Sequence, residues 1–187
     1  MRRVIFLLLA VLLTFCAYAQ ALQGANGEGP RLRLEIEGKG TITIRLYPDK
    51  APKAVAHIVR LAKTGFYDGL RFHRADRKPR PYLVQVGDPQ SRLGNLDAAD
   101  MGTKGSGAKI PYEDSGLPNV VGAVGLARLG EDRDTGDSQF YILLGAQPFL
   151  NGNYTVFGQI VEGMDVVRKI DKGDRIVRAT LVGLPTS

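Results

Sequence analysis

The chain has 187 residues, of which 44% are hydrophobic and 24% charged, and its formal net charge is +6. This length suits one domain with a substantial core and is too short for two. The basic residues are scattered, and their densest group, over residues 74–81, also holds two prolines. No series of aromatic residues accompanies that group, so a solvated turn is favoured over a nucleic-acid-binding surface.

The N-terminal residues have the pattern of a secretory signal peptide. Arg2 and Arg3 precede an apolar run over residues 4–15, and the small-residue motif AYA ends at Ala19. The run is shorter than the roughly 20 residues that a membrane-spanning helix requires. We therefore expect a cleavable signal peptide over residues 1–19 and a periplasmic or secreted mature protein. Cleavage would remove the only cysteine, so no disulfide is expected in the mature chain.

Residues 20–30 are rich in glycine and alanine, and we expect a flexible lead-in there to one domain over residues 31–187. Apolar and polar residues alternate over residues 31–37 and again over 41–46. Strict alternation is typical of a strand with one buried face. The two segments are separated only by a Gly-Lys-Gly turn, so together they predict a β-hairpin.

A helix is expected directly after this hairpin. Apolar residues recur at helical spacing over residues 51–62, and Pro52 suits the first turn. Asp49 is the expected N-terminal cap, and Gly65 is expected to end the helix.

The rest of the chain contains short strand-like segments and one short helix-like segment. The expected helix covers residues 163–170, and the expected strands cover 70–76, 82–87, 122–128, 138–144, 155–161 and 175–182. Residues 89–114 form a long polar segment, which is typical of functional or mobile loops. The pattern predicts a mostly β fold, a closed eight-stranded antiparallel β-barrel capped by two α-helices.

Several common chemistries are disfavoured. The only histidines are His57 and His73, and neither has a carboxylate cluster at metal-ligand spacing. His57 is expected on the surface of the first helix. Ser138 lies in a GDSQF motif that lacks the closing glycine of a nucleophile elbow, and the glycines over 102–107 match no phosphate-binding fingerprint. We therefore expect no metal and no cofactor.

One group of residues remains as a candidate site. Arg74 and Gln85 stand at strand positions where apolar residues would be expected, in two segments that can pair as a hairpin. Pairing would bring a guanidinium and an amide together on one face. Gln139 offers a third polar side chain, and the nearby apolar surface would come from Tyr82, Leu83, Tyr141, Phe149 and Leu150.

Five motifs occur in order along the chain: GFYDGLRFHR at 65–74, QVGDP at 85–89, GDSQFY at 136–141, LNGNYTVFG at 150–158 and VEGM at 161–164. Together they resemble the signature motifs of the cyclophilins, a family of peptidyl-prolyl cis–trans isomerases. The resemblance covers roughly residues 31–182. It implies an eight-stranded antiparallel barrel capped by two helices, in agreement with the strand pattern.

The resemblance also implies roles for individual residues. Arg74 corresponds to the catalytic arginine of the family and Gln85 to the glutamine that orients it. Tyr82 and Tyr141 correspond to aromatic residues of the proline pocket, and we count all four as catalytic. The expected substrate-binding residues are Leu83, Ala127, Arg128, Gln139, Phe149, Leu150 and Tyr154.

Four departures from the family pattern stand out. Residues 77–81 lengthen the connection between the arginine and the glutamine, and Arg128 stands where asparagine is common. Phe149 replaces a tryptophan found in many members, which implies weak inhibition by cyclosporin. Tyr141 stands where the family has phenylalanine and so adds a hydroxyl group.

The expected function is therefore that of a peptidyl-prolyl cis–trans isomerase acting on proline-containing segments of unfolded or flexible proteins. We expect a monomer that does not bind nucleic acid and has no membrane-spanning segment. The alternative is a non-catalytic proline-peptide-binding module, or a holdase chaperone, on the same fold. The lengthened turn over residues 77–81 and Arg128 are the features that keep this alternative open.

Overall fold

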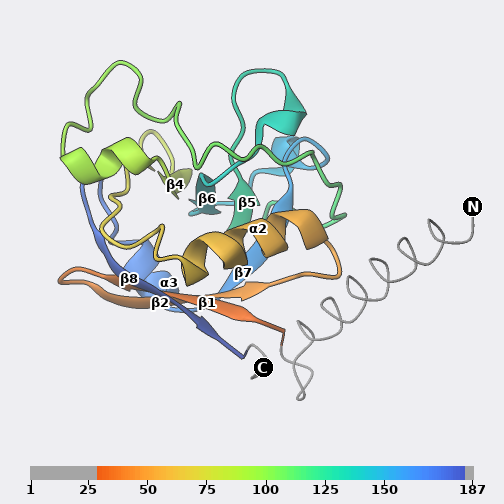
Figure 1. Cartoon of the computed structure of the whole chain (residues 1–187), viewed down its shortest axis with the longest axis horizontal. Coiled ribbons are helices and arrows are strands. Elements are labelled where there is room, and N and C mark those ends of the chain that lie inside the picture. The colour runs from red at the N-terminus through yellow and green to blue at the C-terminus, as the bar shows by residue number, and fades with distance from the viewer. Residues whose placement is uncertain (1–28, 184–187) are drawn as a thin grey trace, which may run out of the picture.

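The computed structural model describes residues 29–183, so the expected signal peptide and most of the lead-in lie outside the described residues. Eight strands form one antiparallel sheet in the order β3-β4-β6-β5-β7-β2-β1-β8. The sheet curls around the core, with β1, β2 and β8 below and β4, β5 and β6 above (Figure 1). The strands are β1 (Arg31–Ile36), β2 (Gly40–Leu46), β3 (Arg74–Asp76), β4 (Leu83–Val86), β5 (Ala123–Leu126), β6 (Phe140–Leu143), β7 (Val156–Glu162) and β8 (Ile176–Val182).

The N-terminal hairpin has the form that its alternating sequence predicts. In β1, Leu32, Leu34 and Ile36 are buried in the core, while Arg33 and Glu35 between them are exposed. β1 pairs with β2 on one side and with β8 on the other. The prediction of a mostly β fold with eight antiparallel strands is therefore confirmed.

The prediction of a closed barrel is wrong in one respect. β3 and β8 stand at opposite ends of the strand order and do not pair with each other. Backbone hydrogen bonds instead join the stretch before β3 to the residues at and just before the start of β8: Phe72 N donates to Asp174 O (2.9 Å) and Ile176 N donates to Leu70 O (2.8 Å). β3 has three residues and soon enters the proline-containing turn, which cannot continue a ladder. The result is a curled sheet that is open along this edge.

Helix α2 (Pro52–Lys63) packs its apolar face onto the core. Pro52 occupies the first turn, where the missing N–H costs no hydrogen bond, and Gly65 follows the last turn with φ +70°, as predicted. The predicted cap by Asp49 is wrong. The Glu113 carboxylate caps the helix instead, accepting hydrogen bonds from the amides of Lys53 (2.9 Å) and Ala54 (2.8 Å).

Because Glu113 bonds two amides that have no partner within the helix, its loss should destabilise the domain. We expect Glu113→Ala to lower the free energy of unfolding by about 1–2 kcal/mol, as for the loss of other N-terminal caps. Urea denaturation followed by circular dichroism measures the change. Glu131→Ala is the control, because its side chain is exposed and makes none of these bonds. Equal stability of the two variants would contradict the capping role.

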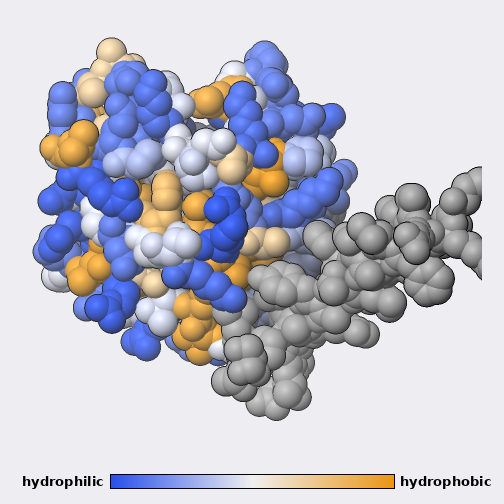
Figure 2. Space-filling view, in the orientation of Figure 1, coloured by the Kyte–Doolittle hydropathy of each residue, from blue (hydrophilic) through white to orange (hydrophobic). Residues whose placement is uncertain are grey.

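The second helix, α3 (Met164–Val167), is a short turn that packs near β2. The core is one continuous cluster of aliphatic and aromatic side chains between the sheet and α2. On the face shown in Figure 2, hydrophilic residues predominate and hydrophobic ones form small separate groups. Within residues 29–183, no helix has both the length and the apolar character needed to cross a bilayer.

Candidate active site

The β3–β4 hairpin brings Arg74 and Gln85 together. The two residues are direct partners across the pair of strands, and Arg74 Nη1 lies 3.4 Å from Gln85 Oε1. Arg74 also pairs with Asp76, at 2.8 Å from Nε and 2.5 Å from Nη2 to the same carboxylate oxygen. Its guanidinium carbon lies 5.7 Å from the centre of the Tyr82 ring. A cation is thus held at the mouth of a pocket by a carboxylate, an amide and an aromatic ring.

A chain of amide hydrogen bonds connects Arg74 to the long loop over residues 89–114. Gln85 Nε2 donates to Gln139 Oε1 (2.9 Å), and Gln139 Nε2 donates to the carbonyls of Gly102 (2.9 Å) and Lys104 (2.7 Å). The fully buried Asp88 carboxylate accepts hydrogen bonds from the amides of these same two residues. The loop is therefore a fixed wall of the site, and each glutamine has a defined orientation.

Apolar residues form the floor beside Arg74. Leu83, Tyr141, Leu150 and neighbouring residues make a second buried cluster, separate from the main core. Tyr141 and Tyr154 meet edge to face, with ring centres 5.8 Å apart. The cavity above this floor has a volume of about 560 Å³. Such a floor suits a small apolar ring and excludes water from it.

The hydroxyl group of Tyr141 is directed away from the cavity. It donates to Oδ1 of the buried Asn119 (2.7 Å), which is in turn bonded to Asn151. Burial raises the pKa of Tyr141, and the nearby Tyr154 and Tyr82 add to this effect, so the phenol remains protonated. The hydroxyl that distinguishes this chain from the family pattern is therefore satisfied behind the pocket wall.

Nine of the eleven predicted site residues line this cavity: Arg74, Tyr82, Leu83, Gln85, Ala127, Arg128, Tyr141, Leu150 and Tyr154. Gln139 lines an adjoining hollow of about 330 Å³ that shares Gln85, Gly102, Ala127 and Arg128 with the first. Phe149 is 66% exposed and lines neither hollow, although its ring centre is 6.3 Å from that of Tyr82. The structure thus brings together the residues that the motifs indicated, with Phe149 at the margin.

The structure adds residues that the sequence did not indicate. Asp76 lies two positions from Arg74 on the same strand, and Asn119 lies under Tyr141. The period-two spacing of a strand was a usable signal for Asp76. Leu96, Met101 and Lys172 also line the cavity, from segments with no recognisable motif.

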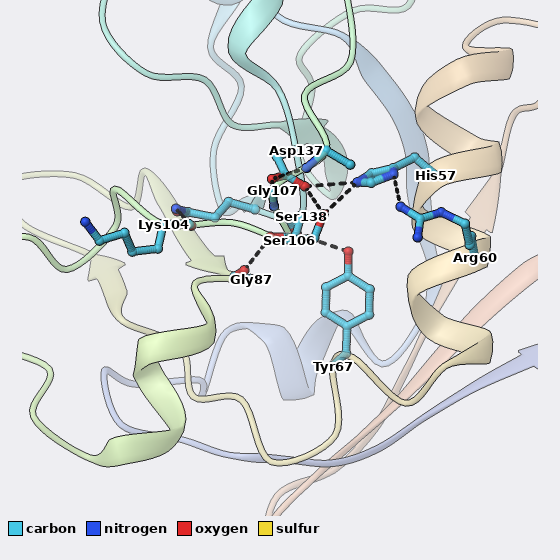
Figure 3. Close-up of polar contacts among 11 residues, drawn as sticks. His57, Arg60, Tyr67, Gly87, Lys104, Ser106, Gly107, Asp137 and Ser138 are labelled. Carbon is cyan, nitrogen blue, oxygen red and sulfur yellow. Dashed lines mark hydrogen bonds and ion pairs between the residues drawn. The ribbon is translucent and has the colours of Figure 1, made fainter.

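A second polar cluster lies around Asp137, which itself lines the adjoining hollow (Figure 3). The Asp137 carboxylate accepts hydrogen bonds from His57 Nε2 (3.0 Å), from Ser106 Oγ and from the amide of Gly107 (2.8 Å). The other ring nitrogen of His57 contacts Arg60. The expectation that His57 is a surface residue is therefore wrong: it is 8% exposed, because it anchors the loop to α2 through Asp137.

This cluster predicts sensitivity to acid. Burial alone would raise the pKa of Asp137, but hydrogen bonds from His57, Ser106 and Gly107 outweigh it, so the net pKa lies below its ordinary value. A carboxyl whose pKa is lower in the folded state stabilises the fold above its unfolded pKa of about 3.9, and this contribution is lost as the pH falls through the folded value.

We expect Asp137→Asn to reduce the stability of the domain at neutral pH and to weaken the fall in stability between pH 5 and pH 2. Denaturant titrations at several pH values measure both effects. Asp165→Asn is the control, because that side chain is 76% exposed. An unchanged pH dependence in Asp137→Asn would show that this carboxylate does not contribute to acid sensitivity.

The buried Ser138 and His73 do not form a hydrolase site. Ser138 Oγ donates to the carbonyl of Gly87 (2.7 Å), so the hydroxyl is a structural link between two strands. His73 is also buried, and burial lowers its pKa, which keeps the ring neutral. Within residues 29–183, no group of three or more potential ligands is arranged to hold a metal ion.

Comparison with solved structures supports the fold. A cyclophilin-type peptidyl-prolyl cis–trans isomerase from Cryptosporidium parvum superposes with a TM-score of 0.69 over 83% of this chain and 98% of its own, at 23% identity. A cyclophilin from Hirschia baltica gives a TM-score of 0.62 over 80% of this chain and 73% of its own, at 22% identity. At such low identity these likenesses establish the architecture alone.

Comparisons of sequence find relatives with higher identity to this chain. A probable peptidyl-prolyl cis–trans isomerase of Brucella suis is 39% identical, over 86% of this chain and 88% of its own. Peptidyl-prolyl cis–trans isomerase B of Bacillus subtilis is 38% identical, over 74% of this chain and 89% of its own. Residues 31–181 match the family model described as cyclophilin type peptidyl-prolyl cis-trans isomerase/CLD. This chain therefore belongs to the cyclophilin-type peptidyl-prolyl cis–trans isomerases.

Proposed function

We propose that this protein accelerates rotation about X–Pro bonds in unfolded or flexible protein segments, with Arg74 as the central catalytic group. The observation that carries the proposal is the fixed guanidinium beside an apolar floor large enough for a proline ring. Family membership supports the activity, and the site geometry supports the assignment of roles.

The chemistry needs neither a nucleophile nor a metal. Rotation about a peptide bond has a barrier of about 18–20 kcal/mol because amide resonance must be broken. The two isomers of an X–Pro bond differ by only about 0.5–1 kcal/mol, so a catalyst only has to stabilise the twisted state. In that state the prolyl nitrogen recovers a lone pair, which a hydrogen-bond donor can stabilise better than it stabilises the planar amide.

Arg74 suits this role because its guanidinium stays protonated and has a rigid, planar set of donors. Asp76 engages the Nε side of the group, and Gln85 contacts Nη1. These partners fix the plane of the guanidinium, and the remaining N–H groups are available to the substrate. Tyr82, Leu83 and Leu150 would hold the proline ring while the preceding carbonyl group rotates.

The proposed location outside the cytoplasm rests on the N-terminal pattern alone. The Arg-Arg pair, the apolar run and the small residues before position 20 together support a cleavable signal peptide. Mass spectrometry of the protein purified from its native host tests the proposal. A mature N-terminus at Gln20 supports export, whereas an intact Met1 would contradict it.

One observation favours the second candidate, a proline-peptide-binding module without turnover. Asp76 already neutralises Arg74 in the free protein, and a substrate must share the guanidinium with that carboxylate. If Asp76 withheld the donors from the twisted amide, the pocket would bind proline peptides without accelerating their rotation.

The deciding experiment measures cis–trans interconversion of a short Ala-Pro peptide, by exchange NMR, with and without the purified domain. Acceleration in proportion to protein concentration supports the isomerase. Saturable peptide binding, seen as chemical-shift changes, without faster exchange would favour the binding module. Refolding of a protein limited by prolyl isomerisation provides a test on a polypeptide substrate.

A further inference from the structure

The cavity extends beyond the region that a proline ring would occupy. It is also lined by Leu96, Ala98 and Met101 from the long loop and by Lys172 from the turn before β8, which together are here called the far wall. Its total volume of about 560 Å³ lies within the range of pockets that enclose whole small ligands. A proline ring alone would leave much of this space empty, so a neighbouring residue of the peptide has room to enter.

The far wall is fixed by hydrogen bonds and an ion pair. Asp97 pairs with Lys172 at 2.6 Å, which links the loop to the turn before β8. Next to Lys172, the amide of Gly173 donates to Phe72 O (2.8 Å), two residues before Arg74. The amide of Met101 donates to Ala98 O (2.9 Å), which closes a tight turn in the loop. The Asp97 side chain is 91% exposed, so the backbone hydrogen bonds are the main reason that this wall needs little ordering when a peptide binds.

Three cations around this hollow are paired with carboxylates within the protein, whereas Arg128, which also lines the cavity, stacks on the Tyr154 ring. Lys172 is paired with Asp97, Arg74 with Asp76, and Lys104 with Asp100 at 3.4 Å. An acidic or basic side chain of a peptide would have to compete with these partners, and its charge would add little to the binding free energy. The hollow also has apolar surface: Leu96, Ala98 and Met101 are half-buried and border the cavity. Methionine also adapts readily to different apolar shapes.

We propose that Leu96, Ala98 and Met101 form a flanking subsite that binds an aliphatic side chain of the residue next to the proline. The proposal rests on the proposed function, since the peptide is positioned by its proline on the floor beside Arg74. The subsite would give the enzyme a preference among X–Pro or Pro–X sequences. The hollow is continuous with the proline-binding floor, so one extended peptide can occupy both.

The test compares peptides that carry Leu, Ala, Glu or Lys immediately before or immediately after the proline. We expect kcat/KM to be about fivefold higher for Leu than for Ala at one of these positions, a modest gain typical of added methylene groups in an apolar pocket. In Leu96→Ala/Met101→Ala this ratio should fall below about twofold. In Ala98→Asp the preference should shift from Leu towards Lys.

Leu93→Ala is the matched control, because Leu93 lies in the same loop but is 85% exposed and does not line the cavity. It should keep the full preference for Leu. Equal kcat/KM for Leu and Ala peptides in the unaltered protein, or an unchanged ratio in the double variant, would overturn the subsite and leave the isomerase function intact.

Peptide dissociation constants measured in parallel separate the two proposals. One outcome is that the protein accelerates the isomerisation of no peptide, but binds Leu peptides more tightly than Ala peptides and loses this difference in the double variant. The subsite then stands and the isomerase function fails. If neither the rates nor the Kd values distinguish Leu from Ala, the subsite is rejected whatever the activity.

Discussion

Arg74→Ala is expected to lower kcat/KM for an Ala-Pro peptide by about 100- to 1,000-fold, the usual cost of removing a donor that acts on developing charge. The loss should appear in kcat, with peptide affinity little changed, because the proposed bond to the prolyl nitrogen forms only in the twisted state. The apolar floor that is proposed to bind the proline ring is a separate buried cluster that does not include Arg74. Exchange NMR at saturating and subsaturating peptide gives the two parameters.

Arg74→Lys distinguishes geometry from charge. A lysine keeps the positive charge but cannot engage Asp76, Gln85 and a substrate with one planar group. We therefore expect most of the activity to be lost in this variant as well. The control is Arg33→Ala. Arg33 lies on β1 and does not line the cavity, so this variant should retain full activity. A loss confined to peptide affinity in Arg74→Ala would instead support the binding module.

The position of the Arg74 guanidinium also depends on Asp76. Because its carboxylate lies on the same strand as Arg74, the β3 backbone fixes both charges relative to each other. Gln85 is held in turn by Gln139 and the loop carbonyls. The guanidinium is therefore positioned by two residues of its own hairpin, one of which is held by the distant Gln139, and this is the kind of preorganisation that electrostatic catalysis requires.

The strands and α2 could be predicted because their signals are local. The alternation in β1 and β2, the helical spacing after Pro52 and the glycine that follows α2 each depend on a few adjacent residues. The pairing of Arg74 with Gln85 could also be anticipated, since a hairpin brings neighbouring segments into register. For the site, the motifs indicated most of the residues that line the cavity.

The features that the sequence did not reveal depend on contacts between distant segments. The carboxylate of Glu113 caps a helix whose first residues lie about 60 positions earlier, so the local sequence indicates the nearby Asp49 instead. His57 is buried because Asp137 reaches it from 80 positions later. The open edge of the sheet follows from the length of β3, which no pattern of apolar residues determines.

The residues of the proposed subsite could not be predicted from the sequence for the same reason. Leu96 and Met101 lie in a polar segment with no periodicity, and only the folded loop places them beside Arg74. The path of that loop is set chiefly by the buried Asp88, which bonds two of its amides, whereas the ion pair between Asp97 and Lys172 is exposed and adds little. None of these pairings has a spacing that marks it in the sequence.

Gly125→Ala is expected to destabilise the domain by about 2–3 kcal/mol, a typical cost of overpacking, and to lower kcat/KM by about 10- to 100-fold. Gly125 pairs directly with Tyr141 across β5 and β6. The phenol ring lies over the glycine, and an added methyl group would overlap its Cζ and hydroxyl oxygen. To make room for the methyl group, Tyr141 would have to break its hydrogen bond to Asn119 and tilt into the proposed proline-binding floor.

A double-mutant cycle tests this reason. Tyr141→Leu removes the overlapping atoms, so Gly125→Ala should cost clearly less in that background than in the unaltered protein. Gly38→Ala is the control: a methyl group there meets nothing within 4 Å, so only its φ of +66° opposes the change, at about 1 kcal/mol, with kcat/KM unaffected. If Gly125→Ala lowered the free energy of unfolding equally in both backgrounds, Gly125 would not be needed to make room for Tyr141. The dependence of the proline-binding floor on this glycine would then be disproved.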